Sequence, residues 1–569
     1  MFLKKICLTL LVCLYIIITI SSGAFAGTTY QAKRQTDKGQ QADLVILGKI
    51  WGFLKYHHSE IMRGKYDWDD KLIEFLPSYL ACRSHQERNQ LLSTWITGLG
   101  TVPKYVPVSD SIKIDFKSKP DYAWIDQSDL PTNLKSLLEN LKQNHSIADQ
   151  YYLNYQSEDD VTAVSFPHEK NYTDTTQTGI EFRLLAVFKW WSIIEYWYPY
   201  KYLTGNWKKH LEKFVSNALL ATSSSEYRML IQKMVSAIGD THADIIASQV
   251  EEANGRWELP ITIKFLEGKA LVSSVNPGVE TIKVGNIIQS INSVPVSRLV
   301  DQKSPFVPAS NKPALLRKLS IIITRMPDST AHLVLEDNLG TTQSLHVRNV
   351  KVNPLAKKKT FDFAYQKDSS FYRVSEGVIY TNIANVKDRD IPLIKKLLDS
   401  AKGMVVDCRQ YPYYSGAYLM VNLLLPHPTA VSKYVCPVKG FPGGFRYSKP
   451  MYIGQENPKF FKGKVVVLVN ENTISAAELY AMAFRLSPNS VILGSTTSGS
   501  DGNVSPLICL PGGYYTRMTS LGVYYPDGRE TQQVGILPEI TVKQSIRGLR
   551  NQHDELLSRA IAEINKRTK

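Results

Sequence analysis

Apolar and polar positions alternate with different periods along the chain, and the changes of period divide it into three regions. Up to about residue 255, apolar and aromatic residues recur at helical spacing and predict packed helices. From residue 256 to about 350 the pattern favours short strands, which are Ile261–Phe265, Ala270–Val275 and a piece from Val284 to Val296. In the last region, the run Val465–Val469 is typical of a strand buried on both faces. The expected fold class is therefore multidomain α/β.

The helical region contains two copies of one pattern, with an offset close to 140 residues. Ile50–Tyr56 followed by Trp68 resembles Trp190–Tyr196 followed by Trp207. Both copies continue through an amphipathic stretch, so we expect a duplicated helical unit. The helical spacing of the aromatic residues favours core packing over an exposed ligand-binding surface.

The two copies end alike but continue differently. The first ends at Thr97–Gly100, whereas the second ends at Ser236–Gly239 and runs on into Asp240-Thr241-His242. Only the second copy therefore presents a histidine next to a hydroxyl residue. Between the copies, residues 104–180 are polar and rich in Asn, Asp and Ser, which predicts a long irregular connection.

Ser475 lies between the strand 465–469 and a helix-forming stretch that it begins. At such a junction the hydroxyl projects from the sheet edge, and the first N–H groups of the helix can face a developing oxyanion. The position therefore suits a nucleophile. The alternative is that Ser475 only caps the helix, with Glu478 closing a capping box three residues later.

The residues that follow Ser475 favour the catalytic interpretation. A second strand from Val491, a glycine-rich loop around Ser500, a hairpin from Gly522 and a terminal segment from Val534 come in that order. This multi-part pattern resembles the catalytic core of the S41 peptidases, which comprise the carboxyl-terminal processing proteases and the tricorn-related proteases. The resemblance implies a ClpP/crotonase-like α/β core that cleaves peptide bonds through an acyl-enzyme.

The two branches of that family activate the serine by different bases. The processing proteases use a lysine in the glycine-rich loop, where this chain has Ser500. No lysine lies between Ser475 and Lys543, so a Ser/Lys dyad from this loop is excluded. The tricorn-like branch instead uses an upstream histidine beside a hydroxyl residue, together with a glutamate downstream of the serine.

The resemblance to that second branch implies a role for each residue. His242 is expected to be the general base, because serine needs a neighbouring base that is neutral near pH 7. Thr241 is expected to support it through a hydroxyl hydrogen bond, and Glu530 is expected to orient the imidazole. Gln532 aligns nearly as well as Glu530 with the acidic position of the family.

A further family element occurs in altered form. Gly403–Asp407 followed by Arg409 resembles the family strand that ends in Asp-x-Arg before a glycine-containing loop. The resemblance implies an oxyanion hole formed by the N–H of Ala476 and one N–H from the loop at Tyr413. Tyr413 and Tyr414 replace the glycines, so the access of glycine to positive φ is lost there. Asp407 and Arg409 are expected to pair as structural residues.

The strand-rich region is similar to a PDZ domain. The segment Val284–Val296 resembles the PDZ signature, with Asn286 and Ser293 in place of the usual Asp and Gly. A PDZ domain would bind an extended peptide by adding it as a strand, and would so deliver substrate to the protease. The alternative is a small β-domain without affinity for peptides.

The first 26 residues predict export. Lys4 and Lys5 precede an apolar run from Ile6 to Ile20, and Ala24–Ala26 before Gly27 fits a signal-peptidase site. We therefore expect a periplasmic or secreted protein, with an uncleaved N-terminal anchor as the alternative. The run is too short for a comfortable membrane span.

Charge and cysteine content change this picture little. The net charge of +15 is spread along the chain, which favours association with anionic envelope surfaces and gives no nucleic-acid motif. Removing the signal segment leaves Cys82, Cys408, Cys436 and Cys509, whose spacing matches no zinc site. We therefore expect no metal and no cofactor.

Together these features predict an exported serine endopeptidase that acts on peptides or proteins. The alternative is a catalytically inactive peptide-binding protein that keeps the fold, which the lost glycines favour. The expected segments are a signal peptide (1–26), the first helical copy with a linker (27–165), the second helical copy with His242 (166–255), a PDZ-like domain (256–352) and an S41 catalytic core with a C-terminal helix (353–569).

Overall fold

The sheet next to Ser475 has central strands whose side chains are buried on both faces. The computed structural model describes residues 38–101, 114–144, 150–353, 363 and 370–566, and the described residues from Gly39 onward form one compact unit. In the sheet order β14-β15-β16-β20-β21-β26, β14 is antiparallel to its neighbour and the other strands run parallel. The bounds are β14 (Phe371–Ser375), β15 (Val378–Asn382), β16 (Gly403–Asp407), β20 (Lys464–Val469), β21 (Ser490–Gly494) and β26 (Ile540–Thr541).

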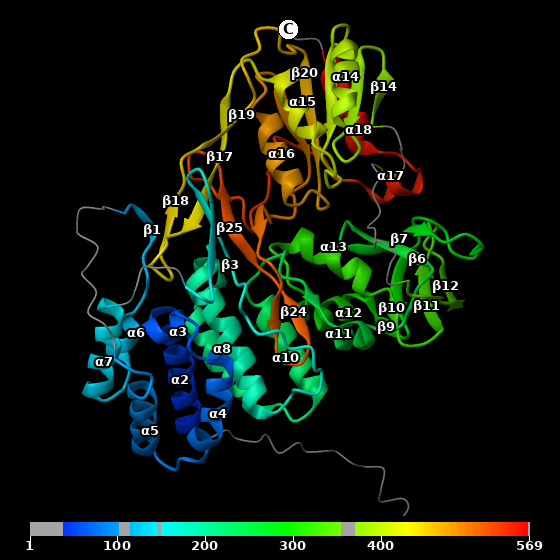
Figure 1. Cartoon of the computed structure of the whole chain (residues 1–569). Coiled ribbons are helices and arrows are strands. Elements are labelled where there is room, and N and C mark those ends of the chain that lie inside the picture. The colour runs from blue at the N-terminus through cyan, green and yellow to red at the C-terminus, as the bar shows by residue number, and fades with distance from the viewer. Residues whose placement is uncertain (1–37, 102–113, 145–149, 354–362, 364–369, 567–569) are drawn as a thin grey trace, which may run out of the picture. The chain divides into compact units, whose positions relative to one another are not determined.

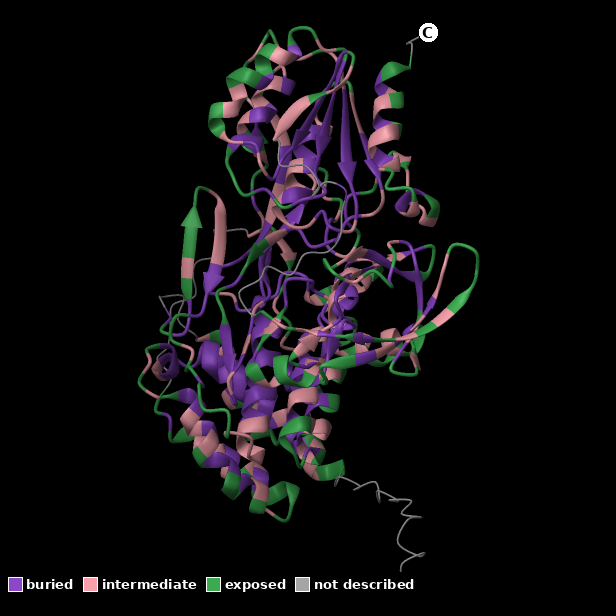
Figure 2. Ribbon diagram, turned by 90° about the vertical axis from the view of Figure 1, so that its right-hand side faces the viewer, coloured by how far each residue is buried: buried purple, intermediate pink, exposed green. Residues whose placement is uncertain are grey.

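Helices cover both faces of this sheet (Figure 1). Val465, Val467 and Val469 of β20 pack against α14 (Ile391–Leu398), α15 (Gly416–Leu424) and α16 (Ala476–Arg485). Val466 and Leu468 point the other way and pack against α18 (Glu555–Asn565). This alternation is the period of two that a strand imposes, with an apolar residue at each position because both faces are covered. Figure 2 shows central strands of this sheet as buried. The multidomain α/β class is confirmed.

A second sheet lies in the region predicted to be strand-rich, in the order β12-β11-β8-β7-β6 with β9 beside β8. Its edge strand β6 packs beside helix α13. The elements here are β5 (Trp257–Glu258), β6 (Ile261–Leu266), β7 (Lys269–Val275), β8 (Ile287–Ile291), β9 (Val294–Pro295), α12 (Val296–Lys303), α13 (Lys312–Ile322), β10 (Arg325–Met326), β11 (Thr330–Glu336), β12 (Thr342–Arg348) and β13 (Val350–Lys351).

Two further sheets connect the C-terminal half of the chain to the N-terminal half. One has the order β1-β18-β17-β25-β22, and the other, β23-β24-β4, pairs a strand next to His242 with a C-terminal hairpin. Their strands are β1 (Phe116–Ser118), β4 (Ile245–Ile246), β17 (Thr429–Pro437), β18 (Phe445–Tyr447), β19 (Met451–Ile453), β22 (Gly502–Val504), β23 (Ile508–Leu510), β24 (Tyr514–Thr516) and β25 (Thr519–Tyr524).

The N-terminal helices contain two matching tryptophan pairs. Trp51 and Trp68 each donate their indole N–H to the other's carbonyl oxygen, at 3.2 and 3.0 Å. Trp191 and Trp207 make the same exchange at 3.1 and 3.2 Å. Each pair joins two helices and satisfies both buried indoles. The helices are α2 (Lys38–His57), α4 (Trp68–Ala81), α8 (Ile180–Trp197) and α9 (Trp207–Leu220), with α3 (Ser59–Met62), α5 (His85–Thr97), α10 (Ser224–Ser236) and α11 (Ser248–Asn254) beside them.

The central helices of the two copies approach each other closely. A Cβ on Gly52 of α2 would lie 2.0 Å from Oγ of Ser192 on α8, so only glycine fits there. The four tryptophans of the two pairs are buried, with at most 3% of each exposed. The aromatic residues therefore form a core, and these pairs offer no ligand-binding surface.

The connection between the copies is less irregular than its composition predicts. Within the described residues it contains α6 (Ala123–Gln127), α7 (Thr132–Gln143) and a hairpin of β2 (Asn154–Glu158) and β3 (Val161–Ser165). The prediction of an irregular segment is wrong for these stretches. In α7 the residues Leu134, Leu138 and Leu141 form a buried stripe in an otherwise polar sequence. Three apolar residues at helical spacing suffice because the rest of the helix faces solvent.

A buried cluster of four charges joins the two copies. Glu169 accepts ion pairs from Lys55 at 2.6 Å and Lys189 at 2.9 Å. Asp69 lies 3.2 Å from Lys189 and 3.8 Å from Lys55, and it also accepts the Tyr172 hydroxyl at 2.8 Å. The four charged side chains are at most 4% exposed. Two carboxylates thus balance two ammonium groups out of contact with water.

Two features of the described residues concern disulfide bonds and membrane-spanning helices. The cysteines of the described residues, Cys82, Cys408, Cys436 and Cys509, are free thiols. In the same part of the chain, no helix combines the length and apolarity needed to cross a membrane. The expected signal segment 1–26 lies outside the described residues.

Glu169→Gln is expected to destabilise the helical region by about 3 kcal/mol, because it leaves one carboxylate facing two buried ammonium groups. The midpoint of urea unfolding, followed by tryptophan fluorescence, measures the change. Glu74→Gln is the matched control, since Glu74 is 64% exposed and pairs only with Lys71. Equal midpoints for both variants would contradict the prediction.

Candidate functional site

Ser475 lies at the carboxyl edge of the parallel strands. β20 ends at Val469 and α16 begins at Ala476, so Ser475 is the N-cap residue of the helix. Its φ of 55° lies in the left-handed region, which is strained for a residue with a Cβ. Its N–H donates to the carbonyl oxygen of Ser500 at 3.0 Å. The strained turn is therefore held against the glycine-rich loop.

The carboxylate of Glu478 organises this loop. It accepts the N–H groups of Ser475 at 3.2 Å, of Gly499 at 2.9 Å and of Ser500 at 2.9 Å, as well as the Thr497 hydroxyl. Burial raises the pKa of Glu478 to about 6, and these donors limit the rise. The capping interaction expected for Glu478 thus extends beyond the helix and fixes the backbone around Ser475.

His242 is positioned by the segment that follows α10. Gly239 has a φ of 60°, and a Cβ there would lie 2.7 Å from Nε2 of Gln533, so the turn favours glycine. The chain then passes His242 and pairs Ile245 and Ile246 with β24. The histidine is therefore held between the helical region and the C-terminal half.

Two buried hydroxyl groups face Nδ1 of His242. Nδ1 lies 2.9 Å from Oγ1 of Thr519 and 3.0 Å from Oγ of Ser500. Ser500 Oγ also donates to Oδ1 of Asp240 at 3.5 Å. With its proton directed to that carboxylate, Ser500 presents lone pairs to the imidazole. This arrangement favours a proton on Nδ1 and a lone pair on Nε2.

Asp240 is the carboxylate beside the imidazole. It has no solvent exposure, and its Oδ1 lies 3.7 Å from Nδ1 of His242. It accepts the backbone N–H groups of Thr519 at 2.7 Å and of His242 at 3.0 Å. Nε2 of Gln532 is a further donor at 3.4 Å. A buried carboxylate needs such donors, since burial without them costs several kcal/mol.

Burial lowers the pKa of His242 below its ordinary value, and Asp240 offsets part of this effect. The positive charges of Arg517 and Lys318 act in the same direction as burial. The imidazole is therefore neutral at pH 7, which is the form that a general base requires.

The expected third residue, Glu530, does not lie with His242. Its carboxylate accepts the Tyr202 hydroxyl, and its backbone bridges to Tyr524 at the far end of β25. Gln532, which aligned nearly as well, is the member of this segment that reaches the site. Asp240 is thus the acidic side chain next to the histidine.

Thr241 contacts the second sheet region. Its hydroxyl accepts the N–H of Ser310 at 2.9 Å and pairs with the Ser310 hydroxyl at 3.0 Å. The Thr241 carbonyl oxygen accepts a hydrogen bond from Nζ of Lys318, which lies on α13, at 2.7 Å. The hydroxyl thus anchors the histidine segment and makes no contact with the imidazole.

Ser475 and His242 are connected through Ser500. The Ser500 carbonyl accepts the Ser475 N–H, and the Ser500 hydroxyl contacts the imidazole. Within the described part of the chain, no hydrogen bond joins the Ser475 hydroxyl directly to His242. The two residues therefore share one neighbour, and their direct contact would have to form when substrate binds.

The expected oxyanion donors lie on two segments. Ala476 is the first residue of α16, where the N–H has no partner within the helix. Tyr413 lies on an exposed loop after β16 and is 60% exposed. Before that loop, Arg409 makes a double hydrogen bond to Asp407, at 3.0 and 2.7 Å, and also pairs with Asp554 at the start of α18. Asp407 and Arg409 thus pair as the sequence predicts.

A cavity of about 830 Å³ opens beside the histidine. His242, Thr241 and Arg517 line it, together with Ile474, the residue before Ser475. The cavity is large enough for several side chains of a peptide. It therefore adjoins both expected catalytic residues.

The comparisons with known proteins concern the fold and the region around Ser475. A family model described as Peptidase family S41 matches residues 385–542, which begin after β15 and end just past β26. This segment of the chain is thus similar to the S41 peptidases. The matched residues include Ser475, the loop at Ser500 and β25, whereas His242 lies outside the matched segment.

Solved structures show the same fold. Mature CPAF in complex with lactacystin has 13% identity and a TM-score of 0.54, over 68% of this chain and 97% of that one. A serine-to-alanine mutant of CPAF has 12% identity and a TM-score of 0.53, over 68% and 99%. At these identities the likeness concerns the fold. A search of curated proteins found no match.

Sequence reasoning missed the polar residues around the imidazole. Asp240 stands two positions before His242 inside the quoted motif, and Ser500 occupies the position expected for a lysine base. Both could have been proposed from these positions. Thr519 gives no sequence signal, because only the pairing of β24 with β4 brings β25 to the histidine.

Glu478 predicts a pH effect on stability. A pKa raised from 4.5 to about 6 means that the folded state holds this proton more tightly, so stability falls as pH rises through that interval. Relative to Glu478→Gln, the wild type is expected to lose about 2 kcal/mol of unfolding free energy between pH 4.5 and 7. Urea unfolding at both values measures it. Parallel changes in the two proteins would refute the assignment.

Proposed function

We propose that the protein is an exported serine endopeptidase in which Ser475 forms an acyl-enzyme. The family match and the peptidase fold support hydrolysis of peptide bonds. The catalytic assignment rests on the buried hydroxyl groups around Nδ1 of His242. One of them belongs to Ser500, whose carbonyl oxygen accepts the N–H of the strained Ser475 turn. Buried polar groups and a strained turn cost stability, and such features cluster at active sites.

Each side chain has a role in this proposal. The Ser475 hydroxyl attacks the peptide carbonyl, and Nε2 of His242 takes its proton, because Nδ1 already faces Thr519 and Ser500. The imidazolium then returns the proton to the leaving amine, and water hydrolyses the acyl-enzyme by the same base.

Asp240 takes the role that sequence reasoning gave to Glu530. It is a positioning residue, since it acts on His242 through the Ser500 hydroxyl and through its own field at 3.7 Å. A buried carboxylate at this distance stabilises the imidazolium that forms in the transition state. Glu530, bonded to Tyr202, keeps a structural role.

The oxyanion would be held by the N–H of Ala476 and by a backbone N–H near Tyr413. The first N–H groups of a helix carry partial positive charge and lack internal partners, which suits them to a developing negative oxygen. Backbone N–H groups do not depend on the side chain, so the tyrosines at 413 and 414 do not remove the donor.

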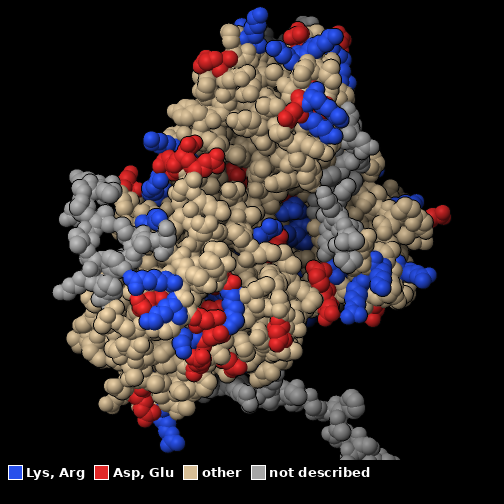
Figure 3. Space-filling model, in the orientation of Figure 1, with Lys and Arg blue, Asp and Glu red and all other residues tan. Residues whose placement is uncertain are grey.

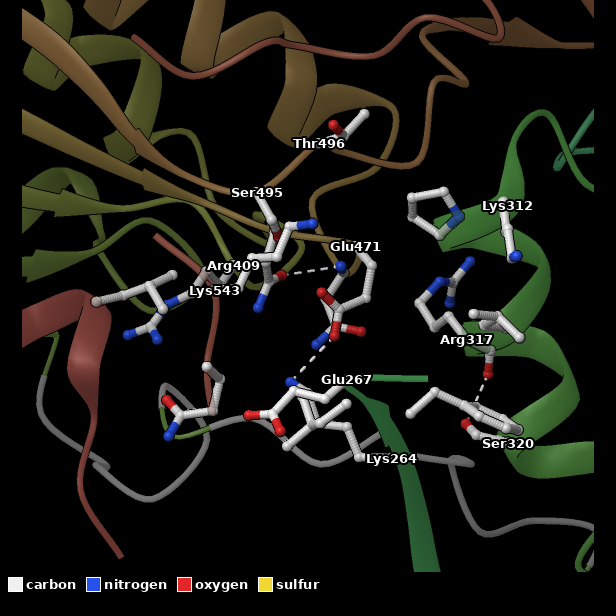
Figure 4. A pocket seen from close by; sticks show the side chains of 18 of the residues that line it. Lys264, Glu267, Lys312, Arg317, Ser320, Arg409, Glu471, Ser495, Thr496 and Lys543 are labelled. Atoms are coloured by element: carbon white, nitrogen blue, oxygen red, sulfur yellow. Dashed lines mark hydrogen bonds and ion pairs between the residues drawn. The ribbon is translucent and has the colours of Figure 1, made fainter. Parts of the chain in front are cut away.

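The PDZ-like domain is proposed to bind the extended part of the substrate. A groove of about 550 Å³ runs between the edge strand β6 and α13, and its lining includes Glu471 and Asn472 of the turn before Ser475. Figure 4 shows Lys312 and Arg317 on α13, with Glu471 on the facing wall. Glu471 is also paired with Lys264 of β6 at 3.0 Å. A peptide strand added to β6 would run towards the serine of the ClpP/crotonase-like core.

A catalytically inactive peptide-binding protein is the second candidate. It is favoured by the absence of a direct hydrogen bond between Ser475 and His242 in the described residues and by the tyrosines at the oxyanion loop. Both candidates use the same groove, so only the reactivity of Ser475 separates them.

Export and envelope association complete the proposal. The leader-like composition of residues 1–26 supports export. Figure 3 shows basic and acidic side chains interspersed over one face. The net charge of +15 supports weak attraction to an anionic envelope surface.

Labelling of the purified mature protein with a fluorophosphonate probe tests the proposal. The wild type is expected to label, Ser475→Ala to lose all labelling, and His242→Ala to lose most of it. Asp240→Asn is expected to slow labelling about 10²–10⁴-fold, because the imidazolium loses its carboxylate. A gel scan of labelling against time gives the rates.

Glu530→Gln is the matched control and is expected to label within about threefold of the wild type. A fall as large as that of Asp240→Asn would restore Glu530 as the orienting carboxylate. Absence of labelling in the wild type, under conditions that label a control hydrolase, would make the inactive binding protein the leading candidate.

A further inference from the structure

The cavity beside His242 has an excess of positive charge. Six Lys or Arg side chains line it, against two acidic ones. Lys318 lies 2.6 Å from Asp244, and Arg325 lies 2.8 Å from Glu251. The two carboxylates of the described lining are therefore already paired with cations of the same wall.

Arg517 is a cation of the cavity wall whose charge acts on His242. It lies between β24 and β25, two positions before Thr519, whose hydroxyl contacts the imidazole. Its Nε is buried and has no hydrogen-bond partner among the described residues. An unsatisfied buried donor costs about 1–3 kcal/mol and therefore needs an explanation, and a ligand that supplies the acceptor is one such explanation.

The rest of the cavity wall suits a peptide. Ile245, Phe306 and Ile321 supply apolar surface, and Ile474 continues the wall to the residue before the nucleophile. A chain bound at Ser475 would therefore place neighbouring side chains over apolar residues with Arg517 in their reach.

The charge of Arg517 also bears on the reaction. Arg517 disfavours a positive charge on His242, as the lowered pKa of the imidazole reflects. The transition state requires an imidazolium, so an unneutralised Arg517 opposes the chemistry. A substrate carboxylate that pairs with Arg517 would remove this opposition and would also satisfy the buried N–H.

We propose that Arg517 is a specificity residue that binds a substrate carboxylate in this cavity, so that the enzyme prefers peptides with an acidic group close to the scissile bond. The inference rests on the proposed peptidase function. The acidic group is either the side chain of Asp or Glu or a free C-terminal carboxylate, which share one chemistry. Pairing involves charge and hydrogen bonds alone, with no covalent step.

Matched fluorogenic peptides test this inference on the mature protein. One set places Glu or Gln at each position around a fixed apolar cleavage sequence, and a second set carries either a free or an amidated C-terminus. The wild type is expected to show a kcat/KM at least about tenfold higher for the acidic member of one set. The set that shows the difference identifies the source of the carboxylate.

Variants of Arg517 separate the inference from a folding defect. Arg517→Gln is expected to bring the ratio within about threefold of one, and Arg517→Glu to invert it in favour of a Lys peptide, a gain that a misfolded protein cannot give. Arg529→Gln is the control of equal charge change, since Arg529 is 69% exposed and pairs with Asp527. It is expected to keep the ratio of the wild type.

The outcomes distinguish this inference from the proposed function. A wild-type ratio near one at every position and terminus, or a ratio that survives Arg517→Gln, would overturn the role of Arg517 while leaving the peptidase intact. If the wild type shows no fluorophosphonate labelling, the peptidase proposal fails. Fluorescence anisotropy then measures binding of the same peptides to Ser475→Ala and tests the role of Arg517 separately. Equal binding of acidic and neutral peptides there would also overturn the inference.

Discussion

Asp240 is a fully buried carboxylate, and the donors that it requires are the constraint around which the site is assembled. A carboxylate out of contact with water is stable only when its oxygens accept hydrogen bonds. Here the donors are the N–H groups of His242 and Thr519, the Ser500 hydroxyl and the Gln532 amide. They come from the histidine segment, β25, the glycine-rich loop and the terminal segment. Satisfying one charge therefore brings four distant parts of the chain to one point.

Glu478 plays a comparable part on the side of the nucleophile. Its carboxylate gathers N–H groups from the Ser475 turn and from the loop at Gly499 and Ser500. Asp501 lies buried next in the chain, and burial and the charge of Glu478 both raise its pKa. Ser500 belongs to both networks, since its N–H goes to Glu478 and its hydroxyl to Asp240. The serine and the histidine are thus aligned by one shared residue, although they lie on separate regions of the fold.

Sequence patterns were sufficient for the parts of this site that depend on local structure. The buried run of β20, the helix after Ser475 and the edge-strand region around β6 each follow from the period of the apolar residues. The pairing of Arg409 with Asp407 was accessible for the same reason, because the two residues adjoin one strand end. The helix α7 was missed because its three buried leucines are set in a polar sequence, and composition outweighed spacing.

The proposed third catalytic position depends on long-range packing, and sequence position alone does not single out Asp240 over Glu530. Glu530 was chosen because it is the acidic residue of its segment, but the turn of that segment directs Gln532 inwards and leaves Glu530 with Tyr202. Asp240 is close to His242 in sequence, yet its proximity has meaning only once β24 pairs with β4 and brings Thr519 alongside. Side-chain type indicated a carboxylate, and the pairing of remote strands accompanies the placement of Asp240 beside the histidine.

The charges around His242 explain why its state would depend on what occupies the cavity. The carboxylates of Asp240 and Asp244 favour the imidazolium, whereas burial, Arg517 and Lys318 oppose it. Lys318 is already paired with Asp244, so its field is partly cancelled within the protein. Nε of Arg517 has no hydrogen-bond partner among the described residues, so a bound anion can pair with it and offset its field. The balance at the base would therefore shift towards proton uptake only when the cavity is filled by a group of negative charge. Pairing of a substrate anion with Arg517 would then both bind the substrate and favour protonation of His242 in the transition state.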